Sequence, residues 1–142
     1  MSGNPIATTA GLTTLRLATD EVYCRLDAAA TTIAGLVRQA LYDAGVPHVV
    51  QAAGNLFSPF FVKNAESTSV RNFTQAGDQA LHRHRAFFHS MLDQGVYLPP
   101  SAFEAWFVSA AHDDRAIDRI AAALPRAAAA AAASRPDYEG PA

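Results

Sequence analysis

The sequence is poor in cysteine and lysine. Cys24 is the only cysteine among its 142 residues, so the chain can form no internal disulfide and no cysteine zinc site. This thiol usage is typical of a reducing compartment, and we expect a cytoplasmic protein. Lys63 is the only lysine among 11 basic residues, so any chemistry that requires an amine nucleophile has a single candidate.

Long apolar runs and an excess of charge of either sign are also missing. Nowhere do 18 apolar residues follow one another, and no basic stretch precedes an apolar one near the start, which argues against a membrane span and a signal peptide. The 11 basic and 13 acidic residues give a formal net charge of −2, and the basic ones are scattered. The sequence therefore predicts neither nucleic acid nor a membrane as a partner.

The residues that are present predict one globular domain that begins with two helices. Half of the chain is hydrophobic and 17% is charged, as in a single folded domain. Asn4 and Pro5 suit the N-cap and first turn of an initial helix. From Asp20, apolar residues recur at helical spacing until Gly45, which would end a second helix as its C′ residue.

Four apolar runs predict short strands. They lie at 46–53, 55–62, 96–98 and 105–110. Gly54 and Asn55 would form a tight turn between the first two. Pro59 lies inside the second run and has no N–H, so we expect that strand at an edge of the sheet or with a bulge.

The second half of the chain predicts a polar loop at 63–77, two further helices and a loose tail. Asp78 would cap the third helix, and either His112 or Asp113 the fourth. Apolar positions expected in the third helix are Leu81, His84, Phe88, Met91 and Leu92. Pro125 interrupts the fourth pattern and the alanines that follow offer little apolar area, so a frayed helix and a disordered tail are expected there.

Two groups of side chains invite a site, and their spacing argues against both. His82, His84 and His89 are separated by two, five and seven residues, which does not place them one helical turn apart, so we do not predict a metal site. Ser101, Glu104 and His112 are the residue types of a catalytic triad. No GxSxG motif accompanies them, and a triad is defined by its geometry.

Four further residues have a simple structural interpretation. Asp113 and Asp114 suit a helix N-terminus better than an acid–base pair. Cys24 fits a partly buried inert thiol, with a reactive thiolate as the alternative. Lys63 most simply solvates its loop, because a Schiff-base amine would need burial to lower its pKa.

Three segments resemble one known family. They are SGNPIATTAGLTTL (2–15), AAGNLFSPFF (52–61) and AFFHSMLDQGVYLPPSAFEAWFVSAAHDD (86–114). With their spacing, they resemble the C-terminal part of the glutamate-1-semialdehyde 2,1-aminomutases, which are pyridoxal-phosphate proteins of the class III aminotransferase family. The resemblance covers 2–124. The Gly-Val-Tyr-Leu-x-Pro-Ser-x-Phe-Glu core of the third segment is specific to aminomutases rather than to aminotransferases in general.

The resemblance implies that the chain corresponds to one part of a longer protein. In the family a large domain binds pyridoxal or pyridoxamine phosphate, the C-terminal part forms a small domain, and the enzyme is a homodimer. The expected fold is α/β (α+β), with about four largely antiparallel strands and helices packed on one face. We divide it into a connecting helix 1–19, the small domain 20–124 and the Ala-rich tail 125–142.

The same resemblance assigns roles to five residues. Beside the cofactor phosphate of the partner subunit would lie Ser2, Gly3 and Asn4, and on the substrate side Ser101 and Glu104. It implies no catalytic residue and no metal in this chain, because the family's Schiff-base lysine, the aspartate opposite the pyridine nitrogen and the phosphate loop lie upstream. Lys63 does not match that lysine, so no cofactor is expected for this chain alone.

The implied activity of the complete enzyme is an isomerisation, the conversion of glutamate-1-semialdehyde into 5-aminolevulinate for tetrapyrrole (porphyrin) synthesis. We expect no turnover by this chain alone. One alternative is a non-catalytic interaction module that docks on a full-length homologue, because removal of the large domain would expose Ile6, Leu12 and Leu15. Another is a small-molecule-binding α/β domain with a pocket of its own.

Overall fold

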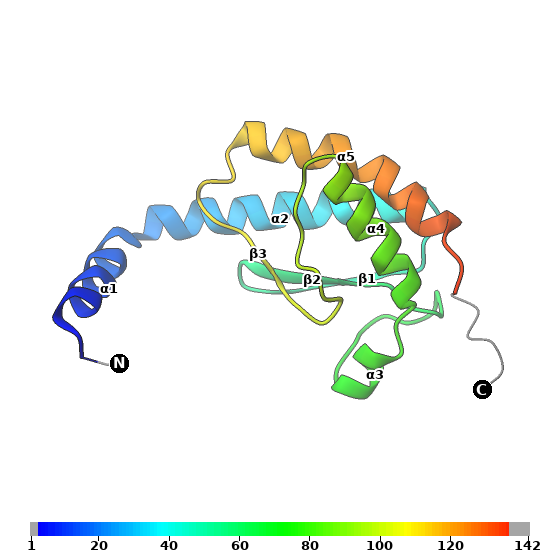
Figure 1. Ribbon diagram of the computed structural model, residues 1–142, viewed down its shortest axis with the longest axis horizontal. Coiled ribbons are helices and arrows are strands. Elements are labelled where there is room, and N and C mark those ends of the chain that lie inside the picture. Colours follow the sequence, from blue (N-terminus) through cyan, green and yellow to red (C-terminus); the bar gives the residue numbers. More distant parts are fainter. Residues whose placement is uncertain (1–2, 137–142) are drawn as a thin grey trace.

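The computed structural model describes residues 3–136, and within this range five helices and three strands form (Figure 1). In chain order they are α1 (Pro5–Leu17), α2 (Asp20–Asp43), β1 (Val49–Ala53), β2 (Leu56–Phe60), α3 (Phe73–Gly77), α4 (Leu81–Asp93), β3 (Trp106–Phe107) and α5 (Asp114–Ala133). The expected α+β class, with an antiparallel sheet and helices on one face, is confirmed. None of these helices is long and apolar enough to cross a membrane.

The sheet is antiparallel with the strand order β1-β2-β3. A two-residue turn joins β1 to β2 as expected, and Gly54 takes φ +61° at its first position, where such turns favour glycine. Residues 96–98 were predicted to form a fourth strand. They do not pair within the described chain, although Val96 and Leu98 point into the core as alternate residues of a strand would.

The prediction that Pro59 marks an edge strand or a bulge is wrong. β2 is the central strand, and Pro59 lies in regular register opposite Val50. The turn closes on the pair Ala53–Leu56, so at Pro59 the N–H position points away from β1. On that other side β3 pairs only with Leu56 and Phe57. The missing donor therefore costs the sheet no hydrogen bond.

The first two helices begin and end where the sequence indicated. Asn4 caps α1, and its Oδ1 accepts from the backbone N–H of Ile6 at 2.9 Å. Gly45, at φ +65°, follows the end of α2. Within the described chain no residue of α1 is buried, and Ile6 is 82% exposed. Figure 1 shows α1 (dark blue) extending away from the sheet and the other helices.

The core lies between the sheet and the layer formed by α2, α4 and α5. Side chains of all three helices and of β2 and β3 contribute to one buried cluster. At its centre the ring of Phe61 lies 5.5 Å from that of Phe87, and the rings of Phe57 and Trp106 are 5.2 Å apart. The apolar stripe predicted for the second helix supplies Ile33, Val37 and Leu41 to this cluster.

Two details of the third predicted helix differ from the structure. Asp78 does not cap α4, whose N-cap is Ala80 without a side-chain hydrogen bond, but instead forms an ion pair with Lys63 at 2.6 Å. The fully buried ring is Phe87, whereas Phe88 is only partly buried. A short helix, α3, forms inside the segment predicted as a loop, with Asn72 as its N-cap.

The Ala-rich segment after Leu124 is helical as predicted, but the prediction that this helix is frayed is wrong. α5 continues through Pro125 to Ala133, and Ala127, Ala128 and Ala131 are buried. α5 packs against both α2 and α4. Small side chains allow such close approach, so the alanines bury well despite their small area. The folded unit thus extends beyond 124, and positions 137–142 of the predicted tail lie outside the described residues.

Candidate functional site

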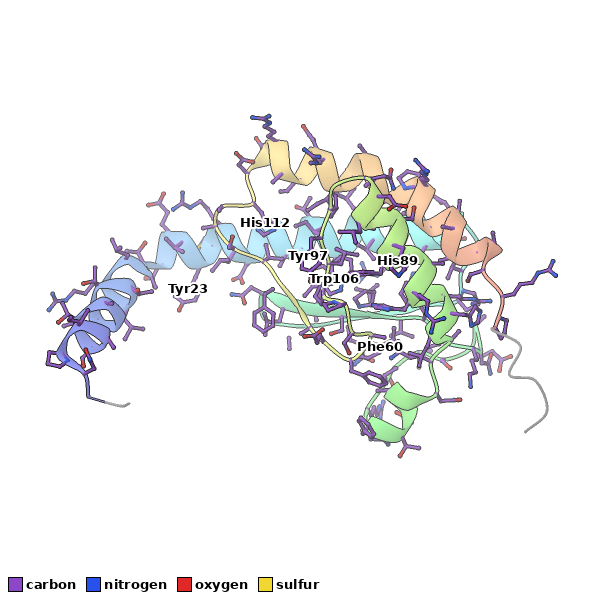
Figure 2. All side chains as sticks on the ribbon, in the orientation of Figure 1. Tyr23, Phe60, His89, Tyr97, Trp106 and His112 are labelled. Atoms are coloured by element: carbon purple, nitrogen blue, oxygen red, sulfur yellow. The ribbon has the colours of Figure 1, made fainter. Side chains whose placement is uncertain are left out.

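A groove of about 440 Å³ opens between the helices and the chain that leads into and out of β3. Its walls are largely apolar: Ile33, Val96, Leu98, Pro99, Ala105, Trp106, Phe107, Val108 and Ile120, with Tyr97, Glu104 and His112 as the members whose side chains carry polar groups. Figure 2 shows Tyr97, Trp106 and His112, which come from different segments, around this region. An apolar groove with few polar groups is the usual form of a small-molecule site.

Glu104 is held at this groove by a tight turn. Its Oε2 accepts from the backbone N–H of Ser101 at 3.0 Å, and Ser101 Oγ accepts from the N–H of Phe103 at 3.2 Å. The Glu104 N–H in turn donates to the Ser101 carbonyl at 3.2 Å. Ser-x-x-Glu is the pattern of a capping box, in which serine and glutamate side chains satisfy neighbouring N–H groups. The Ser-x-x-Glu spacing is visible in the sequence and is the local signal for this turn.

Ser101, Glu104 and His112 do not form a triad. Ser101 meets the Glu104 carboxylate through its backbone N–H rather than its hydroxyl. Nδ1 of His112 accepts from the Ser109 N–H at 3.1 Å, so that nitrogen is engaged away from the other two residues. Ser101 lines a different groove, of about 450 Å³, along α4. The structure therefore brings Glu104 and His112 to one groove and Ser101 to a different one.

The three histidines of α4 do not converge. Within the described residues no group of three His, Cys, Asp or Glu side chains is placed to hold a metal ion. His84 is buried and packs edge-on against Phe61, with ring centroids 6.0 Å apart. His89 is exposed and packs edge-on against Phe88. These contacts assign His84 to the core.

We expect His84 to make stability depend on pH. Burial lowers the pKa of His84 below its usual 6.5. The unfolded chain takes up a proton near that pH and the folded chain does not, so the free energy of unfolding is highest above it and decreases as the pH falls toward the folded-state pKa. Urea denaturation at about pH 7.5 and about pH 5.5 measures this decrease, at most about 1.4 kcal/mol per pH unit.

The variant His84→Phe should lose this part of the pH dependence, because it retains the ring and removes the titrating group. His89→Phe, the same exchange at an exposed position of the same helix, is the matched control. Equal slopes for wild type and His84→Phe would contradict the assignment.

The remaining sequence candidates occupy ordinary positions. Lys63 is 60% exposed in its ion pair with Asp78, so its amine is not in the buried setting that a Schiff base needs. Cys24 is exposed, not partly buried as predicted, because it lies on α2 before that helix reaches the core. Asp113 caps α5, with its Oδ1 accepting from the Ala116 N–H at 2.9 Å. The capping prediction is thus confirmed.

Two of the residues predicted to lie beside a cofactor, Gly3 and Asn4, directly precede α1. Gly3 has φ +88°, a conformation that glycine adopts without strain. The side-chain oxygen of Asn4 is occupied by its hydrogen bonds to the helix N-terminus. Ser2 lies outside the described residues.

Two solved transaminases each contain a part with the same fold. A transaminase with PLP bound matches with a TM-score of 0.71 and 24% identity, over 92% of this chain and 28% of that protein. An omega-transaminase from Sphaerobacter thermophilus matches with a TM-score of 0.65 and 23% identity, over 88% and 28%. At these identities the likeness defines the fold.

A sequence relative indicates a more specific class of protein than the fold does. The chain is 51% identical over 144 residues to a glutamate-1-semialdehyde 2,1-aminomutase from Tropheryma whipplei (strain Twist). The match includes 99% of this chain and 30% of the relative, so the chain spans less than a third of that protein's length. The resemblance to the C-terminal part of these aminomutases is confirmed. No family model matches the chain.

Proposed function

We propose that this chain is the C-terminal part of a glutamate-1-semialdehyde 2,1-aminomutase, an enzyme that converts glutamate-1-semialdehyde into 5-aminolevulinate for tetrapyrrole synthesis. The observation that carries the proposal is the 51% identity to such an enzyme over 99% of the chain. The transaminase fold supports it independently. The exposed free thiol of Cys24 is compatible with action in the reducing cytoplasm.

We do not propose a pyridoxal phosphate site within the described residues, because none of them offers the buried amine that a Schiff base needs. Lys63, the one lysine of the sequence, is exposed and paired with Asp78. We therefore assign the cofactor, in its pyridoxal or pyridoxamine form, to the large domain of the complete enzyme, where it would supply the electron sink for the amino exchange. This chain would contribute the wall that faces the substrate.

Within that wall, Glu104 is the residue proposed to approach the substrate, and Ser101 holds it. The proposal is supported by the position of Glu104 at the apolar groove and by its hydrogen bond to the Ser101 N–H. In a homodimer, Ser2, Gly3 and Asn4 would lie beside the partner subunit's cofactor phosphate. The exposed apolar side chains of α1 would be covered by the large domain.

The exposed apolar side chains of α1 also favour a second candidate function. A chain that presents Ile6, Leu12 and Leu15 on an unburied helix could dock on a full-length homologue and modulate it without taking part in catalysis. The two functions differ in whether the docked chain is required for product.

The test is the formation of 5-aminolevulinate from glutamate-1-semialdehyde and pyridoxamine phosphate. It compares the chain alone, the upstream two-thirds of a close homologue alone, and the two mixed. We expect product only in the mixture. Product from this chain alone would overturn the assignment of the chemistry to the upstream part, and no product in the mixture would favour the interaction module.

Variants of the chain make this assay specific. Glu104→Gln should lower the rate of the mixture, because it removes the charge proposed to face the substrate. Glu66→Gln is the matched control, since Glu66 is exposed on the 63–72 loop away from the groove. Equal rates for both variants would remove Glu104 from the site.

A further inference from the structure

Gln79 is a buried polar side chain that joins three separate segments. It is 4% exposed and lies two residues before α4. Its Oε1 accepts from the Phe61 N–H at 3.2 Å, and its Nε2 donates to the carbonyls of Ala76 at 2.8 Å and Ala102 at 3.3 Å. The amide group is therefore used on both its oxygen and its nitrogen side.

The backbone around Gln79 is itself fixed. Gln79 forms a β-bridge with Val62, and the neighbouring Ala80 N–H donates to the Phe61 carbonyl at 2.7 Å. The side chain thus extends from a point tied to the end of β2. Phe61, whose N–H donates to the Gln79 side chain, is fully buried in the core. The backbone and the Oε1 side of Gln79 are thus fixed to the core, and its Nε2 is available to hold another segment there.

The segment held on that side is the turn that carries Glu104. Ala102 lies between Ser101 and Glu104, and its carbonyl is the acceptor of the Gln79 amide. A second, longer bond reaches the same turn from β2, where Ser58 Oγ donates to the Glu104 carbonyl at 3.4 Å. The turn also has hydrogen bonds within itself, and the ring of Phe103 stacks on that of Phe73 with centroids 5.8 Å apart.

We infer that Gln79 is a positioning residue, which fixes the 101–104 turn against the core and thereby sets the Glu104 carboxylate at the groove. The inference rests on the proposed function for the role of Glu104, but its structural step stands on the described hydrogen bonds alone. Gln79→Met removes the amide at nearly constant volume. It leaves the buried Phe61 N–H and Ala102 carbonyl without their partner, so the turn loses its hydrogen bond to Gln79 while the longer bond from Ser58 remains.

Gln51 provides a matched control. Its side chain also makes paired backbone hydrogen bonds, with the carbonyl and the N–H of Val70, but these hold the 63–72 loop to β1. Gln51→Met therefore removes the same chemical group, and the loop that loses its hydrogen bonds is 63–72 rather than the 101–104 turn. A general loss of packing would affect both variants, whereas a positioning role at Glu104 belongs to Gln79 only.

The first readout is the backbone order parameter of the amides of 101–104, measured by ¹⁵N relaxation on the 142-residue chain. We expect values near about 0.85 in the wild type and in Gln51→Met, and below about 0.6 in Gln79→Met. Unchanged values in Gln79→Met would overturn the inference. If Gln79→Met does not fold, Gln79→Glu replaces it, because it keeps the acceptor for Phe61 and loses the donors for Ala76 and Ala102.

The second readout is product formation in the mixture with the upstream part of a homologue. Gln79→Met should lower kcat/KM about tenfold, which corresponds to about 1.4 kcal/mol, while Gln51→Met stays close to the wild type. A mobile turn with unchanged kcat/KM would overturn the link between Gln79 and the reaction. A wild-type mixture without product, together with a mobile turn in Gln79→Met, would overturn the proposed function and leave the anchoring role of Gln79 supported.

Discussion

Replacing Phe61 by alanine should lower the free energy of unfolding by about 3–5 kcal/mol. The side chain is 0% exposed, and its ring lies between those of Phe87 and His84. Its removal leaves a cavity among side chains that the sheet and α4 hold in place, so the neighbouring groups can move little to fill it. Because small domains are stable by only about 5–15 kcal/mol, this one change removes much of the total.

Urea denaturation of wild type and variant at one pH measures this loss. Phe73→Ala is the control, since it deletes the same atoms from a side chain that is 81% exposed on α3. We expect the control to change stability by at most about 0.5 kcal/mol. A Phe61 variant no less stable than the Phe73 variant would show that the core is not centred on this ring.

Ala128→Asp should lower the free energy of unfolding by about 3 kcal/mol or more. Ala128 is fully buried where α5 packs on its neighbours, so Ala128→Asp places an unpaired charge and added volume in a space filled by one methyl group. The effect tests the correction to the sequence prediction directly. If 125–133 were a frayed helix in solvent, the substitution would have almost no effect.

Ala129 gives the matched control, because it is the next residue of the same helix and is exposed. Ala129→Asp changes the charge and the helix propensity equally and buries nothing. The difference between the two variants in free energy of unfolding therefore isolates burial. Equal stability of the two variants would contradict the burial of Ala128 and support the frayed tail that the sequence predicted.

The corrections to the sequence predictions share one cause. Pro59 was assigned to an edge because it has no N–H, and it occupies the central strand because β3 pairs with only the other end of β2. The alanine segment was assigned to a tail because it has little apolar area, and it is buried because neighbouring helices approach closely. In each case the deciding fact is what lies beside the residue in space.

Some residues of the candidate site could be predicted from the sequence, and one could be recognised only in the folded structure. Glu104 and Ser101 were named from the resemblance, and the Ser-x-x-Glu spacing that holds them together is itself a local pattern. Gln79 carried no signal, because a lone glutamine before a helix is an ordinary surface residue in any sequence. Its three partners are distant or unremarkable along the chain until the fold brings them to one point.

Elements with local causes could be predicted from the sequence. The Asn4-Pro5 start of α1, the Gly45 end of α2 and the Gly54 turn each depend on the conformations open to a few consecutive residues. The folded structure was needed for the order of the strands, the burial of the α5 alanines and the hydrogen bond that holds the 101–104 turn. Those outcomes depend on packing and hydrogen bonding between segments far apart in the chain, whose energies no local pattern contains.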